Sequence, residues 1–68
     1  MWQPEGIWNA CFGSTETRET VLAEADRQSI APQDYAMTCV LEAQKQGADF
    51  DTSDAFASLC RQLDIANS

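Results

Sequence analysis

The chain has no histidine and only three cysteines among its 68 residues. Nucleophilic catalysis by cysteine needs a base that forms the thiolate, most often His, so this route is closed. Structural zinc normally takes four Cys or His ligands, whereas Cys11, Cys39 and Cys60 are isolated from one another. An odd, dispersed set is also a poor disulfide framework. We therefore expect reduced thiols on apolar helix faces and no metal.

Glycine is scarce as well, and its positions exclude a further class of site. A loop that cradles phosphate needs clustered glycines, but Gly6, Gly13 and Gly47 are scattered. Paired carboxylates could carry out acid–base chemistry, yet a chain this short can hardly enclose the dry pocket that shifts their pKa values. We therefore expect a protein that is not an enzyme and needs no cofactor.

Basic residues are few: four Lys and Arg stand against eleven Asp and Glu, which gives a net charge of −7 and a sequence pI near 4.1. Nucleic acids and anionic membranes need a basic footprint, so direct binding to either is not expected. No apolar run approaches transmembrane length, and "MWQPEGIWNACFG" lacks the features of a signal peptide. These observations predict a cytoplasmic protein whose partners are proteins, some of them basic.

What is present indicates a small helical domain. A hydrophobic fraction of 44% is too high for a disordered acidic tail. Gly, Pro and capping residues divide the chain into four segments with helical periodicity. We predict one all-α domain of three or four short helices in a bundle, with helices at about 4–12, 15–29, 32–46 and 52–65 and fraying at 66–68.

Helix-start and helix-stop residues support these boundaries. Pro4 and Pro32 suit the first helical position, and Gly13 and Gly47 suit the position after a helix end. For the second helix, Ser14 or Thr15 can act as the cap.

Apolar residues at helical spacing predict the buried faces. The second helix has a narrow stripe, the third a broad face and the fourth a single stripe. The predicted core residues are Val21, Leu22, Ala25, Tyr35, Ala36, Cys39, Val40, Ala43, Phe56, Leu59, Cys60 and Leu63. Met37 and Leu41 pair at i, i+4 on a different face of the third helix.

The stretch "GADFDTSDAFASLC" concentrates acidic residues before the last helix. A calcium-binding EF-hand loop that began at Asp49 would need Gly at its sixth position and Glu at its twelfth, where Asp54 and Cys60 stand. Asp51 or Thr52 can instead accept hydrogen bonds from the free N–H groups of the first helical turn. The Asp54 carboxylate interacts favourably with the positive end of the helix dipole. The stretch therefore predicts a helix start rather than a metal loop, with Phe50 as its apolar anchor.

These features favour a regulator or inhibitor that binds a protein. Apolar anchors surrounded by acidic side chains are typical of such surfaces, and small acidic helical chains of this kind are typical of phage or mobile-element proteins that disable host machinery. We also predict a homodimer, paired through Met37 and Leu41 if these residues are exposed. The candidate partner-binding residues are Trp2, Trp8, Met37, Leu41, Glu16, Glu19, Glu24, Asp26, Asp49, Asp51 and Asp54.

Two alternatives stay open. In the first, the carboxylates mimic nucleic-acid phosphates and occupy the basic groove of a DNA- or RNA-binding effector, as an anti-CRISPR protein would. In the second, "ETVLAEADRQSIAPQDYAMTCVLEA" resembles the helical part of ribbon-helix-helix or helix-turn-helix proteins, over less than half of the chain. That resemblance implies an antitoxin or transcriptional regulator, although a groove-reading element should carry more Lys or Arg.

Overall fold

A computed structural model describes residues 2–65 and contains, within that range, four helices and no strand. The helices are α1 (Pro4–Cys11), α2 (Arg18–Arg27), α3 (Pro32–Lys45) and α4 (Thr52–Leu63). The predicted all-α fold is confirmed. Among these residues no helix is long and apolar enough to cross a membrane. The predicted fraying of 66–68 lies outside the described residues.

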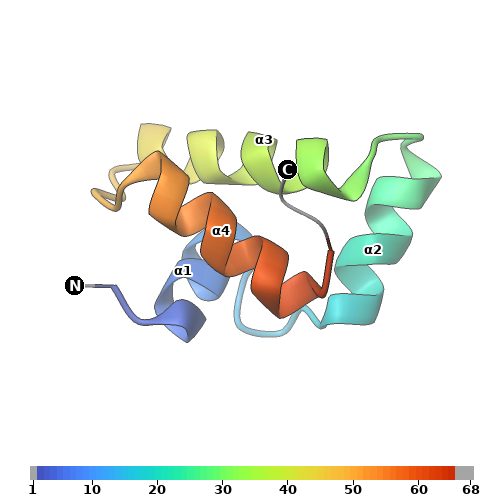
Figure 1. Ribbon diagram of the computed structural model, residues 1–68, viewed down its shortest axis with the longest axis horizontal. Coiled ribbons are helices and arrows are strands. Elements are labelled where there is room, and N and C mark those ends of the chain that lie inside the picture. The colour runs from blue at the N-terminus through green and yellow to red at the C-terminus, as the bar shows by residue number, and fades with distance from the viewer. Residues whose placement is uncertain (1, 66–68) are drawn as a thin grey trace.

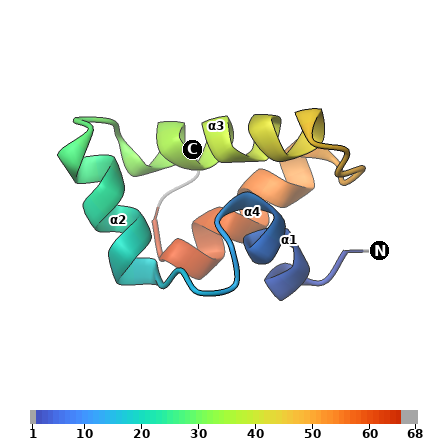
Figure 2. The same cartoon turned by 180° about the vertical axis from the view of Figure 1, so that it is seen from behind.

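Helices α3 and α4 form the centre of the fold, because each of them packs against the other three helices. In Figure 1, α3 runs along one edge, α2 stands across its beginning, and α4 lies in front of α1. The view from behind shows α1 on the opposite face of α4 (Figure 2). The segment that joins α3 to α4 therefore lies at the end of α3 farthest from α2 (Figure 1).

The core is made mostly from the predicted helix faces, although the predicted core residues Leu22, Tyr35, Cys39 and Phe56 are only partly buried. Val40, Leu59 and Leu63 are its largest fully buried aliphatic side chains. Ala36, Ala43 and Ala55 are buried as well, and such small residues allow close approach of the helix backbones. The remaining buried apolar residues come from all parts of the fold: Ile7, Val21, Ala25, Phe50 and Cys60.

The second helix starts later than the sequence pattern predicted. Its cap is Thr17, not Ser14 or Thr15. The Thr20 hydroxyl accepts a hydrogen bond from the backbone N–H of Thr17 over 2.8 Å, and the Thr17 hydroxyl accepts one from the backbone N–H of Thr20 over 3.3 Å. This reciprocal arrangement satisfies two backbone donors at the start of the helix. The helix ends at Arg27, two residues early, and Ser29 adopts a left-handed φ of 58°.

The other helix starts agree with the prediction, and their ends fall one or two residues earlier than expected. Pro4 and Pro32 are the first residues of α1 and α3. Gly13 and Gly47 follow α1 and α3 with φ values of 104° and 110°, a conformation that residues with a side chain rarely adopt.

Candidate protein-binding surface

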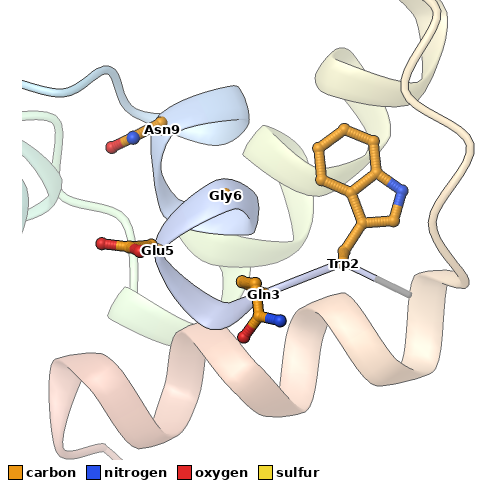
Figure 3. Close-up of a pocket in the computed structure, with 5 residues that line it drawn as sticks. All are labelled: Trp2, Gln3, Glu5, Gly6 and Asn9. Carbon is orange, nitrogen blue, oxygen red and sulfur yellow. The ribbon is translucent and has the colours of Figure 1, made fainter.

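Trp2 lies just before α1 and contacts the segment that joins α3 to α4. Its ring meets Phe50 edge-on, with centroids 5.1 Å apart and an interplanar angle of 72°. Its indole N–H donates a hydrogen bond to Asp49 Oδ1 over 2.9 Å. Figure 3 shows the ring beside α1 with its nitrogen turned toward that segment. Despite these contacts, 38% of Trp2 stays exposed, so part of the ring remains available to a partner.

Trp2 is flanked by Gly6 of α1, and hydrogen bonding ties the adjoining backbone to α4. A Cβ at Gly6 would make an ordinary contact of 3.5 Å with Trp2 Cε3. The Gln62 side-chain amide of α4 donates to the Pro4 carbonyl over 3.0 Å, which ties the start of α1 to α4. The N-terminal segment is therefore held against α4 by hydrogen bonding as well as by apolar packing.

Hydrogen bonds and a buried side chain also fix the segment after α3. Phe50 is buried, and the Gln44 side-chain amide donates to its carbonyl and to Thr52 Oγ1, over 2.9 and 2.8 Å. Asp51 Oδ2 accepts the backbone N–H of Asp54 over 3.1 Å, so Asp51 caps α4. The predicted helix start is confirmed, and no group of potential metal ligands occurs among residues 2–65.

These contacts enclose a shallow cavity that we call the Trp2 hollow. It measures about 260 Å³. Its lining residues are Trp2, Ile7, Asp49, Phe50, Asp51 and Asp54. A neighbouring cavity of about 380 Å³ runs along α4 toward Arg61 and shares Trp2, Ile7 and Asp54 with the hollow. On its other side, Trp2 borders an open depression beside Glu5 and Asn9 (Figure 3).

The structure brings together four predicted partner-binding residues, namely Trp2, Asp49, Asp51 and Asp54. It also adds Ile7 and Phe50, which the sequence pattern did not assign to the surface. For Phe50 the sequence did contain a signal, because it stands between Asp49 and Asp51. When the apolar side chain of such a turn is buried, the aspartates on either side of it stay at the surface. Ile7 lines the hollow because of the way α1 packs, and the residues near it in the sequence do not indicate this position.

The acidic residues of the second helix region form a separate group. Glu16, Glu19, Glu24 and Asp26 lie in or just before α2, at the end of α3 away from the Trp2 hollow (Figure 1). Glu24 accepts hydrogen bonds from Gln28 and Arg27, and the Gln28 contact is the main cause of a lowered pKa of its carboxyl. This group therefore contributes no carboxylate to the Trp2 hollow.

Trp8 takes part in the internal packing. Its indole N–H donates to the Glu16 carbonyl over 3.1 Å, and its ring meets Phe12 with centroids 4.7 Å apart. Phe12 in turn stacks on Tyr35 of α3 at 6.0 Å. These contacts link α1 and the following loop to α3, so Trp8 serves the fold.

Met37 is half-buried, and 47% of Leu41 is exposed. Leu41 and Trp2 are the large apolar residues that stay exposed among those the structure describes. Exposed polar residues share the outer side of α3 with Leu41, including Asp34, Thr38 and Lys45. Leu41 is therefore a single apolar contact point within a polar face.

The thiols lie in environments that suppress their reactivity. Burial raises the pKa of Cys11 and of Cys39 to about 11, with smaller contributions from Cys39 to the first and from Glu42 to the second. Cys60 is buried, which raises the pKa of its thiol as well. Because the thiolate is the nucleophile, all three are weak nucleophiles near neutral pH.

Comparisons with protein-family models, with curated proteins and with solved structures found no match to this chain.

Proposed function

We propose that this chain is a non-enzymatic regulator that binds another protein through the surface around Trp2. The observation that carries the proposal is the contact of Trp2 with Asp49, which places an exposed tryptophan beside three carboxylates that α4 and its preceding turn hold in place. An origin in a phage or mobile element, with a host protein as the blocked partner, is part of the same proposal.

The chemistry of the surface supports this function. Tryptophan is enriched among the residues that dominate binding energies, because it buries a large rigid area at low entropic cost. Carboxylates around such an anchor orient a basic partner and accelerate its association. The net charge of −7 extends that attraction beyond the contact area.

Leu41, flanked by Met37, is proposed as a second apolar contact, used by another copy of the chain. Self-association is a common way for a small domain to bury more apolar surface. Sedimentation equilibrium tests it directly: a dimer that the Leu41→Ser variant converts to monomer supports the pairing. A wild-type monomer at millimolar concentration rules it out.

The proposed function is tested by affinity capture from a host-cell lysate. The tagged full chain is the bait, and the wild type is compared with two variants. Trp2→Ala removes the anchor, and Leu41→Ser changes a second exposed large apolar residue, which the proposal assigns to self-association and not to the captured partner. Circular dichroism first establishes that all three chains are folded. We expect a discrete captured protein that Trp2→Ala loses and Leu41→Ser retains, with binding then reproduced from purified components.

A captured set that Trp2→Ala leaves unchanged would contradict this use of the surface. The alternative of a nucleic-acid mimic predicts a different pattern in the same experiment. Under that alternative the captured protein is a basic nucleic-acid-binding protein. DNA or RNA competes with the chain for this protein, and high salt abolishes the capture. The second alternative lacks support in its ribbon-helix-helix form, because that fold needs a β-strand and residues 2–65 contain none.

A further inference from the structure

We propose that the Trp2 hollow receives a single lysine or arginine side chain from the partner protein. This inference rests on the proposed function and goes further, because it states the chemistry of the group that the surface recognises.

The lining of the hollow combines the two properties that a long basic side chain needs. Trp2 forms most of its apolar part, together with the small accessible portions of the buried Ile7 and Phe50, and the methylene groups of Lys or Arg can pack against it. Trp2 lines the hollow and is 38% exposed, so its ring is the aromatic group available there to an ammonium or guanidinium group. Burial of the stem and attraction of the charged head therefore occur in one place.

The carboxylates of the hollow retain capacity to accept hydrogen bonds. Asp49 uses Oδ1 for the Trp2 indole, and Asp51 uses Oδ2 for the backbone N–H of Asp54. Each keeps a second oxygen, and within residues 2–65 the Asp54 carboxylate has no hydrogen-bond or ion-pair partner. A cation placed here meets acceptors that internal contacts do not fully occupy.

The balance of charge selects a cation over an anion. The first turn of α4 contributes a positive helix dipole of roughly half a charge, which three carboxylates outweigh. Arg61 lines the neighbouring cavity rather than this one. An anion would therefore be repelled at a helix start that normally attracts it.

The hollow has room for one side chain. Its volume is about 260 Å³, and it borders the neighbouring cavity, with which it shares Trp2, Ile7 and Asp54. A Lys or Arg that projects from a partner surface fits this description, since its backbone stays outside and only the side chain enters.

Nuclear magnetic resonance of the 15N-labelled full chain tests the inference with a defined probe. The titrants are the peptides acetyl-Gly-Gly-X-Gly-Gly-amide, where X is lysine, arginine or, as the uncharged control, norleucine. The Trp2 and Trp8 indole N–H signals report separately, because Trp8 is engaged by the Glu16 carbonyl away from the hollow. We expect the lysine or arginine peptide to shift the Trp2 signal, and norleucine to bind about tenfold more weakly.

A pair of charge variants shows whether the site or the overall charge is responsible. Asp54→Asn removes a carboxylate of the hollow, and Asp26→Asn makes the same change in net charge on α2. We expect Asp54→Asn to weaken binding of the basic peptides about two- to fivefold, with no measurable change for Asp26→Asn. Equal effects of the two variants, or a Trp2 signal unmoved by either basic peptide, would overturn the inference.

The two proposals fail in different ways. If the basic peptides shift Trp2 but capture finds no partner that depends on Trp2, the hollow binds cations and the proposed function is wrong. If a captured partner depends on Trp2 but binds the Asp54→Asn and Asp26→Asn variants equally, the proposed function stands and the assignment of a basic side chain to the hollow is wrong.

Discussion

The Trp2 indole N–H and the Asp49 carboxylate lie 2.9 Å apart although 47 positions separate them in the sequence. Their hydrogen bond joins the segment before α1 to the turn between α3 and α4. Both residues also border the Trp2 hollow, so one contact shapes the candidate surface and contributes to the fold.

The energy of this contact can be measured with a double-mutant cycle. Trp2→Phe removes the N–H donor and keeps an aromatic ring, and Asp49→Ala removes the acceptor. We expect each single variant to lower the free energy of unfolding by about 0.5–1.5 kcal/mol, because a partly exposed hydrogen bond is lost. Urea denaturation of both variants and their double mutant gives the coupling, which we expect at about 0.5–1 kcal/mol. Strictly additive effects would show that the hydrogen bond adds no stability.

The Asp51 cap predicts a loss that depends on the side-chain oxygen. Asp51→Ala leaves the backbone N–H of Asp54 without its acceptor, so the free energy of unfolding should fall by about 1 kcal/mol. Asp51→Ser restores a capping oxygen and should recover most of that loss. Asp26→Ala, an exposed acid within α2, is the charge-matched control and should stay within about 0.5 kcal/mol of the wild type. Equal losses for Asp51→Ala and Asp51→Ser would contradict the capping role.

Two glycines predict opposite responses to the same substitution. Gly47 has a φ of 110°, so Gly47→Ala strains the backbone although no atom lies near the added Cβ. We expect it to cost about 1 kcal/mol of stability. Gly6 lies within α1, where alanine is preferred by up to about 1 kcal/mol, and its Cβ would make an ordinary 3.5 Å contact with Trp2. Thermal unfolding of the two variants should therefore show a lower midpoint for Gly47→Ala and an unchanged or higher one for Gly6→Ala.

The raised thiol pKa values predict a loss of stability at alkaline pH. Cys11 and Cys39 hold their protons in the folded state up to a pKa of about 11, whereas an unfolded thiol releases its proton near 9. Between these values the folded state binds more protons, so the free energy of unfolding falls as pH rises. Below pH 8 this contribution is fully present and constant.

Urea denaturation from pH 7 to 10.5 measures this dependence, with the Cys11→Ala/Cys39→Ala double variant as the control. The decline should be shallower in the double variant, which lacks both thiols. Equal slopes would mean that other groups cause the alkaline loss. Alkylation by iodoacetamide gives a second measurement: at pH 8 the native thiols should react at least about a hundredfold more slowly than a free cysteine.

Local patterns were sufficient to predict the helices, because helix starts and buried stripes depend on residues within a few positions of each other. Pro32 and Gly47 bracket α3 as expected, and Leu59, Cys60 and Leu63 form a buried stripe of α4. The predicted start of α2 was wrong because several residues between 14 and 17 can cap a helix. The reciprocal hydrogen bonds of Thr17 and Thr20 favour one of them, and their geometry is not visible in a pattern of residue types.

Composition and short-range periodicity are enough to establish that this chain is acidic, helical and without histidine or clustered glycine. Which side chains share a surface depends on the tertiary structure. It placed Trp8 in the internal packing, left Leu41 alone among polar neighbours, and brought Trp2 to Asp49. The physical reason is that these outcomes depend on how α1 packs against α3 and α4, and such long-range packing is set by the whole core rather than by neighbours in the sequence.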